Sequence, residues 1–244
     1  MDKSINKHSK YELIHINSCS STNDIAWEKL SSSQKKQCII VSDSQTSGRG
    51  RRENNWFSNE ESLTFSIALT NIPNNKSPFI SLITGIAIVN AINNLYNLES
   101  QLKWPNDIMI KDKKVGGVLV ETKINSESIN SVVGIGLNIN QSENQIPIEL
   151  KKIATSLKIV TGSKKNKTKL LNDIINNFFK SINYNNKEII KNWELLCYHI
   201  NKPIKFHENK KINNGIFLGL YQSGSARILV DNEVKTIESG IIYL

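Results

Sequence analysis

The sequence predicts an α+β fold followed by a small β-barrel at the C-terminal end. Two observations lead to this prediction. Apolar runs with strand and helix periodicities are interspersed as far as Pro203. From Ile204 to Leu244, short apolar segments alternate with regularly spaced turn residues, which indicates about five short strands. We therefore expect an α+β domain over residues 1–200 and a β domain over residues 201–244.

The composition indicates a globular chain that favours anionic partners. Hydrophobic residues make up 39% of the 244 residues, and the net charge is +9. The lysines are scattered, mostly beside asparagines, so the charge indicates solvation and mild electrostatic steering. Cys19, Cys38 and Cys197 form no close pair, which predicts no disulfide framework or CxxC metal site and fits a reducing cytosol. The N-terminal residues contain no apolar run, so we expect no signal peptide.

The first elements lead to a polar loop. Residues 11–16 alternate weakly and predict a strand, and a helix is expected over 25–30 after several capping hydroxyls. The β-branched run 37–41 predicts a buried strand that ends directly before the loop. After the loop, residues 63–69 alternate between apolar and small polar residues, which predicts a half-buried strand.

The elements that follow alternate between helix and strand. Residues 79–91 are apolar at helical spacing but too few for a membrane span, so we expect a core helix. Residues 102–110 contain Trp104-Pro105 and predict a rigid elbow between strands, with a hairpin turn at 111–114. The remaining expected elements are strands at 115–121 and 131–140 and amphipathic helices at 170–182 and 187–198.

The loop at residues 44–57 has the composition of an anion site. Arg49, Arg51 and Arg52 lie within four residues; Gly48 precedes them, and Gly50 separates the first from the second. Glycine permits a close backbone approach to a ligand, and the guanidinium group matches phosphate and carboxylate oxygens. Taken alone, the loop also fits a solvated basic turn or a short stretch that binds nucleic-acid phosphates.

Several common catalytic motifs are absent from the sequence. There is no GxxxxGK[ST] loop or HExxH motif, and both GxG runs lack the third glycine of the dinucleotide fingerprint, at Glu53 and Ile139. Cys197-Tyr198-His199 lies in an expected helix, where sequence neighbours point apart, so we do not expect a nucleophile and its base. What remains is a set of polar and cationic side chains at strand ends, which suits phosphoryl or nucleotidyl chemistry.

The order of the motifs resembles that of the biotin protein ligase family. The resemblance covers about residues 12–244 and implies a central mixed β-sheet flanked by helices and a C-terminal SH3-like β-barrel. About ten residues precede the first expected element, so the chain resembles the monofunctional class without an N-terminal helix-turn-helix domain. The matching motifs are Ser21-Thr22-Asn23, Gly48-Arg49-Gly50-Arg51-Arg52 with Trp56, Lys103-Trp104-Pro105-Asn106-Asp107, Lys114 to Glu121, and Gly134-Ile135-Gly136-Leu137-Asn138.

The resemblance implies attachment of biotin to one lysine of a biotin carboxyl carrier protein through a biotinyl-5′-AMP intermediate. ATP and Mg²⁺ are the implied cofactors, and Arg51 and Lys114 are the implied catalytic residues. Asp107 is the implied Mg²⁺ ligand. The implied biotin-binding residues are Ser21, Thr22, Asn23, Gln45, Arg49, Gly50, Arg51, Lys114 and Gly116. The implied ATP or adenylate contacts are Arg49, Arg51, Trp56, Lys103, Asn106 and Asn138.

The expected partners are biotin, ATP and the carrier protein, in the cytoplasm, with no DNA or membrane. Homodimer formation stays open. Three alternatives also stay open: a lipoate ligase or octanoyl transferase with the same catalytic fold, a nucleic-acid-binding module, and a catalytically inactive homologue. The Gly-Arg loop with its tryptophan argues against the first. The absence of interleaved aromatic and basic residues in the C-terminal strands argues against the second.

The loop departs from the family pattern at Glu53-Asn54-Asn55, where Asn54 stands at a position that is often arginine. A charge-assisted hydrogen bond contributes about 1.5–3 kcal/mol, so its loss would weaken adenylate retention roughly tenfold or more. We therefore predict that Asn54→Arg slows biotinyl-AMP dissociation, measured by release of labelled adenylate after gel filtration. Equal dissociation rates for the two proteins would contradict this prediction.

Overall fold

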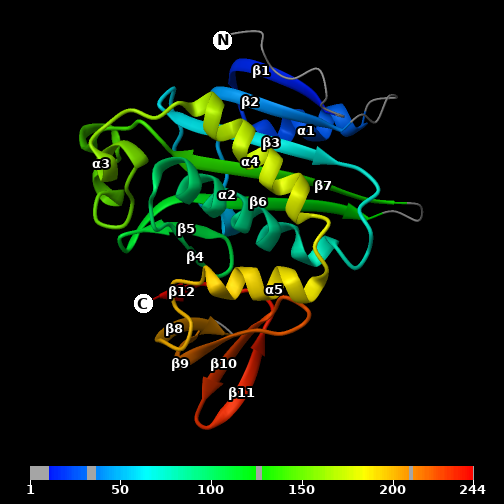
Figure 1. Cartoon of the computed structure of the whole chain (residues 1–244), viewed down its shortest axis with the longest axis vertical. Coiled ribbons are helices and arrows are strands. Elements are labelled where there is room, and N and C mark those ends of the chain that lie inside the picture. Colours follow the sequence, from blue (N-terminus) through cyan, green and yellow to red (C-terminus); the bar gives the residue numbers. More distant parts are fainter. Residues whose placement is uncertain (1–10, 32–36, 125–127, 209–210, 244) are drawn as a thin grey trace. The chain divides into compact units, whose positions relative to one another are not determined.

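The computed structural model describes residues 11–31, 37–124, 128–208 and 211–243, without the side chains of Glu53 and Glu208 (Figure 1). The chain forms two compact units, Met1–Pro73 with Leu119–Gly136, and Asn74–Val118 with Leu137–Leu244.

A seven-stranded sheet has the hydrogen-bonded order β1-β2-β3-β7-β6-β5-β4, and a five-stranded sheet has the order β11-β10-β9-β8-β12. The strands are β1 (Glu12–Cys19), β2 (Cys38–Gln45), β3 (Ser62–Leu69), β4 (Gln101–Lys103), β5 (Asp107–Ile110), β6 (Lys113–Ile124), β7 (Ile129–Asn138), β8 (Pro203–Glu208), β9 (Lys211–Leu220), β10 (Ala226–Val230), β11 (Glu233–Ile237) and β12 (Ile242–Tyr243). The α-helices are α1 (Thr22–Ser31), α2 (Ile80–Tyr96), α3 (Leu157–Thr161), α4 (Lys167–Ser181) and α5 (Asn186–Leu195).

The larger sheet is mixed, as expected from the sequence. In the first unit, β1 and β2 are parallel and are connected through α1, whereas β2 and β3 are antiparallel. Helix α1 packs on β2 and β3. Its apolar residues Ala26 and Leu30 join a buried cluster with Cys38, Ile40, Ala68 and Val132. This packing places the first residues of α1 beside the end of β2 and the middle of β3.

Strand β3 differs from the sequence prediction, because all eight of its residues are buried. The alternation of Leu63, Phe65 and Ile67 with Thr64 and Ser66 predicted one solvated face. That prediction is wrong because α1 covers the face that carries the small polar residues. The side chain of Ser66 contacts Thr22 and Asn23 at the start of α1.

Helix α2 is the apolar core helix of the second unit. The segment Ser77–Tyr96 is long and apolar enough to cross a membrane, but 67% of its most apolar window is buried inside the protein. Helices α4 and α5 pack against α2, and α2 and α4 lie side by side (Figure 1). The prediction of a core helix is therefore confirmed.

The elbow predicted at residues 102–110 joins β4 to β5, and its Trp104–Pro105 peptide bond is cis. The predicted hairpin turn between β5 and β6 is confirmed. Lys111 and Asp112 adopt positive φ angles of 48° and 61°, which permit a tight two-residue turn.

The helices predicted at 170–182 and 187–198 correspond to α4 and α5, and α3 was not predicted. Asn166 and Asn185 cap α4 and α5 through their side-chain oxygens.

The C-terminal strands form the predicted all-β module. Each paired set of strands in it is antiparallel, and the hydrogen-bonded order runs from β11 to β12. Buried Phe206 and Phe217 provide its apolar interior. These strands belong to the same compact unit as α2, α4 and α5, so the domain division near residue 200 stays a prediction.

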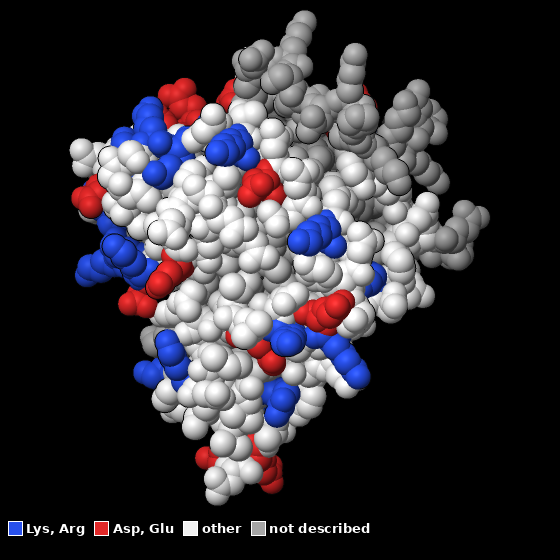
Figure 2. Space-filling view, viewed as in Figure 1, with Lys and Arg blue, Asp and Glu red and all other residues white. Residues whose placement is uncertain are grey.

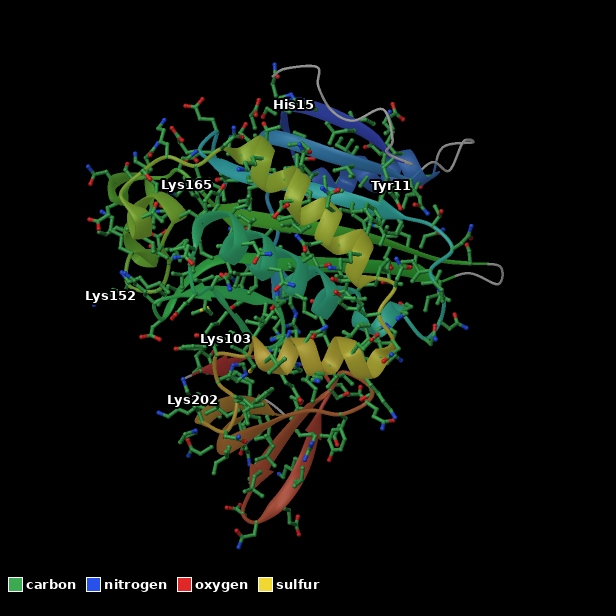
Figure 3. All side chains as sticks on the ribbon, in the orientation of Figure 1. Tyr11, His15, Lys103, Lys152, Lys165 and Lys202 are labelled. Atoms are coloured by element: carbon green, nitrogen blue, oxygen red, sulfur yellow. The ribbon has the colours of Figure 1, made fainter. Side chains whose placement is uncertain are left out.

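Cys197 and His199 do not point apart, as the sequence had suggested. Helix α5 ends at Leu195, and the Cys197 thiol lies 3.5 Å from Nδ1 of His199. Burial raises the pKa of Cys197 to about 12. Burial, together with the charges of Lys103 and Lys202 (labelled in Figure 3), lowers the pKa of His199 to about 3. Both groups are therefore neutral at pH 7 and form part of the core rather than a nucleophile and base.

We predict that His199 makes the protein sensitive to acid. Its pKa is lower in the folded state than the ordinary value of 6.5, so between pH 6.5 and about 3 the unfolded chain binds more protons. Stability is then lost as the pH falls below 6.5, at up to about 1.4 kcal/mol per pH unit. His199→Phe, which keeps a ring beside Phe217, is expected to reduce this slope in denaturant titrations between pH 4.5 and 7.5. An unchanged slope would contradict the assignment.

Candidate functional site

The predicted residues at the start of α1 form a buried hydrogen-bonded chain in the first unit. Gln45 Oε1, at the end of β2, accepts hydrogen bonds from the backbone N–H of Thr22 at 2.8 Å and from its hydroxyl at 3.1 Å. The hydroxyl of Ser66 lies 2.7 Å from Thr22 Oγ1 and donates to Asn23 Oδ1 at 2.6 Å. Ser21, Thr22, Asn23 and Ser66 are all buried. The structure thus joins three of the predicted site residues, Thr22, Asn23 and Gln45, and adds Ser66 to them.

The Gly-Arg loop folds back on itself within the same unit. The N–H of Trp56 donates to Gly48 O at 2.8 Å, and the N–H of Gly50 donates to Asn54 O at 2.6 Å. The indole of Trp56 lies directly over Gly136 of β7, where a Cβ atom would stand 2.3 Å from the ring. Only glycine permits this approach, which explains one glycine of the Gly134-Ile135-Gly136 motif. Arg51, half-buried, begins a single 3₁₀ turn, and Arg52 after it adopts a left-handed φ of 53°.

Arg49 binds two carboxylates that the sequence did not associate with it. Its guanidinium group donates to both oxygens of Asp24, at 2.9 and 2.6 Å, and to Glu121 Oε1 at 3.3 Å. The other oxygen of Glu121 accepts a hydrogen bond from the indole N–H of Trp27 at 2.7 Å. The bond from Arg49 lowers the pKa of Asp24, while the Asp24 carboxylate raises the pKa of Arg49. The side chains of Arg49 and Asp24 are 41% and 39% exposed, so water and ligand anions can compete for this ion pair.

In the second unit, the elbow and β6 bring three charged residues together. Lys103 and Asp107 are paired across β4 and β5, and Lys114 Nζ lies 2.6 Å from Asp107 Oδ1. The side chain of Lys114 extends over Gly117, within 3.4 Å of the position of a Cβ atom there. Burial lowers the pKa of Lys103, Asp107 opposes that effect and Lys114 adds to it. A partly desolvated cation beside another cation is a favourable place for an anion.

The backbone around these charged groups is held in place by hydrogen bonds. The N–H and C=O groups of Lys114 bond to Ile153 and Thr155, respectively. The amide of Asn106 donates to Val118 O at 2.7 Å, and that of Asn138 donates to Thr155 O at 3.0 Å. Asn106 and Asn138 therefore bind protein carbonyls through their amide N–H₂ groups, which leaves their roles toward ATP as predictions. Gly116 is buried at the second position after Lys114.

The described residues provide few metal ligands. No group of three or more His, Cys, Asp or Glu side chains within the described part of the chain is arranged to hold a metal ion. Asp107 offers one carboxylate, next to two lysines. Mg²⁺ in nucleotide sites is commonly held by one or two carboxylates together with substrate phosphates and water. The donor set thus fits an ion that arrives with a nucleotide rather than one bound by the protein alone.

Sequence reasoning missed several residues that the fold brings to the site. Asp24 is 25 positions from Arg49, and Glu121 is 72 positions away. A hint for Ser66 was present, because β3 combines an apolar face with a face of small polar residues. Figure 2 shows Lys and Arg interspersed with Asp and Glu on the described part of the face in view, without a continuous basic stripe there.

Three comparisons place the chain among known proteins. Residues 16–138 match the model of the biotin/lipoate A/B protein ligase family. The bifunctional ligase/repressor BirA of Bacillus subtilis (strain 168) is 32% identical over 239 residues, which span 95% of this chain and 74% of BirA. The structure of the biotin protein ligase of Aquifex aeolicus in complex with biotin and ATP has a TM-score of 0.79 at 28% identity, covering 95% of this chain and 97% of that one.

A more distant structure shares the fold. The biotin protein ligase of Leishmania major in complex with biotinyl-5-AMP has a TM-score of 0.64 at 20% identity, and the match covers 93% of this chain and 98% of that one. The predicted fold class is therefore confirmed. From the matched residues and the extent of the similarity, the chain belongs to the biotin/lipoate A/B protein ligase family, and within it to the biotin protein ligases.

Proposed function

We propose that the protein activates biotin with ATP and transfers it to a lysine of a biotin carboxyl carrier protein. In the first step the biotin carboxylate attacks the α-phosphorus of ATP and pyrophosphate leaves, which gives biotinyl-5′-AMP. In the second step the ε-amino group of the carrier lysine attacks the acyl carbon and AMP leaves. One observation best supports this proposal. A chain with the biotin protein ligase fold carries both a hydrogen-bonded group of polar side chains and a lysine that is held in place by an ion pair with a carboxylate.

The first step must bring two anions together, and we assign this task to the cations. Two like charges about 4 Å apart repel by about 4 kcal/mol at an effective dielectric constant near 20. Arg51 and Lys114 are the proposed catalytic residues, and we assign to them the positive charge that offsets the carboxylate and the α-phosphate. Lys103 is assigned to the phosphates, since a cation with a pKa lowered by burial gains from a nearby anion. Asp107 orients Lys114 through their 2.6 Å ion pair.

The polar head of biotin is assigned to the first unit. We assign it to buried Ser21, Thr22 and Asn23 and half-buried Gln45, whose side chains carry donors and acceptors of the kind that the N–H and C=O groups of a ureido ring require. Arg49 and Gly50, from the Gly-Arg loop, and Gly116 are assigned to the carboxylate end of biotin. Trp56, Asn106 and Asn138 are assigned to the adenylate.

The proposed cofactor is Mg²⁺, brought with ATP. When bound, it would neutralise charge on the phosphates and assist the departure of pyrophosphate. Asp107 would supply the protein ligand. We further propose that the enzyme works in the cytoplasm, and homodimer formation stays a prediction.

The proposal is tested by incubating the protein with ATP, Mg²⁺, biotin and a biotin carrier domain. We expect a mass gain of one biotinyl group on a single carrier lysine. Arg51→Ala should reduce the rate at least a hundredfold, because it removes positive charge from the transition state. The matched variant Arg52→Ala, at the neighbouring exposed arginine, should reduce it much less. Transfer of lipoate or octanoate with no transfer of biotin would overturn the proposal.

Replacement of Asp24 tests the balance of charge around Arg49. Asp24→Asn keeps the shape of the side chain but removes one of the two carboxylates that bind the guanidinium group. Because Arg49 is assigned to the biotin carboxylate, we expect the KM for biotin to fall about twofold to fivefold at low salt. The effect should be smaller at high salt, because surface charges are screened.

The matched control for this variant is Asp43→Asn, which breaks the exposed pair with His15 in the same unit (His15 is labelled in Figure 3). This control should leave the KM unchanged. A higher KM in Asp24→Asn would show instead that Asp24 holds Arg49 in its working position.

A further inference from the structure

The two carboxylates that bind Arg49 differ in how they are themselves held. Asp24 of α1 accepts hydrogen bonds from both terminal nitrogens of Arg49, and the hydroxyl of Ser20 reaches it only at 3.5 Å. Glu121 of β6 accepts from Arg49 through Oε1 at 3.3 Å, and its Oε2 accepts from the indole N–H of Trp27 at 2.7 Å. Glu121 is therefore anchored independently of Arg49, whereas Asp24 depends mainly on Arg49 for its position.

The bond between Trp27 and Glu121 fixes which carboxylate oxygen faces Arg49. Its direction is certain, because an indole N–H can only donate and an ionised carboxylate can only accept. Lys123, on the same face of β6 as Glu121, places its Nζ 4.3 Å from the centre of the Trp27 ring. Two side chains of β6 thus hold the indole. With Oε2 bound to the indole, Glu121 presents Oε1 to the guanidinium group.

Asp24 occupies the place that a ligand anion would take on Arg49. Two N–H groups of the guanidinium fork donate to the two oxygens of one carboxylate, which is the usual geometry for a bound carboxylate or phosphate. Both side chains are exposed to solvent, so Asp24 can turn away into water. A substrate anion can then take the same two N–H groups. Of the two carboxylates, Glu121 is the one that stays on Arg49 during this exchange.

We propose that Glu121 and Trp27 are positioning residues for Arg49. Glu121, oriented by the indole N–H, holds the guanidinium group while the substrate anion displaces Asp24. Trp27 acts through Glu121 and does not touch the substrate. This inference rests on the proposed function, in which Arg49 binds the carboxylate end of biotin. It gives the two carboxylates opposite roles, because Asp24 competes with the substrate and Glu121 prepares Arg49 to bind it.

The experiment compares Asp24→Asn with Glu121→Gln, since each variant removes one negative charge from the same guanidinium group. If charge alone mattered, both variants would bind an anion more tightly. We expect the KM for biotin to fall in Asp24→Asn but to rise about threefold to fivefold in Glu121→Gln, the size typical of an exposed ion pair. The value of kcat should stay nearly unchanged, because binding and not the chemical step is affected. Glu28→Gln, at the exposed residue after Trp27, controls for the loss of a carboxylate and should leave the KM unchanged.

Trp27→Phe tests the second positioning residue. It removes the indole N–H but keeps an aromatic ring near Lys123. The KM for biotin should rise, and the double variant with Glu121→Gln should show no larger rise than Glu121→Gln alone. Additive effects would overturn the role of Trp27, because the ring would then act through packing. If Trp27→Phe does not fold, benzothienylalanine at position 27 keeps the size of the ring system without the N–H.

A measurement without biotin separates this inference from the proposed function. Trypsin cleavage within residues 49–52 of the ligand-free protein, followed by mass spectrometry, reports how firmly the loop is held. We expect cleavage to be about threefold faster in Trp27→Phe and Glu121→Gln, and unchanged in Glu28→Gln. If wild-type protein does not adenylate biotin, the proposed function fails, and the cleavage rates alone test the positioning of Arg49. Cleavage at the wild-type rate, or a KM for biotin that is unchanged or lower in Glu121→Gln, would overturn the inference.

Discussion

The hydrogen-bonded chain from Gln45 through Thr22 to Ser66 and Asn23 is the constraint on which the first unit depends. It joins the end of β2, the first turn of α1 and the middle of β3, three elements that are distant in sequence. Buried polar groups carry a large penalty when they are unpaired, so such a chain specifies one arrangement of its elements. The apolar cluster beneath α1 determines that the helix packs on the sheet, and the polar chain determines where its first turn lies.

A second constraint is electrostatic and applies in both units. Arg49 is paired with Asp24 and Glu121, and Lys114 is paired with Asp107. Pairing of this kind holds flexible cationic side chains in a defined position before any substrate arrives, which lowers the entropy lost on binding. The carboxylates also moderate repulsion between neighbouring cations such as Lys103 and Lys114. A protein that binds anions thus needs well-placed acidic residues as well as basic ones.

The second unit has an apolar interior of its own. Helix α2 is buried along most of its length, and Trp193, His199 and Phe217 pack ring against ring beneath the C-terminal sheet. His199 and Cys197 have titratable side chains, but burial keeps both of them in their neutral forms at pH 7. A motif of reactive residue types therefore says little until its burial is known, because desolvation removes the charged form that reactivity requires.

The sequence by itself determined most of the helices and strands, the C-terminal β module and the family, because these depend on local periodicity, turn chemistry and ordered motifs. The positions of Arg49, Lys103 and Lys114 at strand ends were predictable for the same reason. Only the tertiary structure decided which residues those side chains contact. It placed Asp24 and Glu121 on Arg49, Ser66 on Asn23 and Cys197 against His199. A period of two distinguishes the faces of β3, but it does not reveal that α1 covers the polar one, since that depends on contacts between residues far apart in the chain.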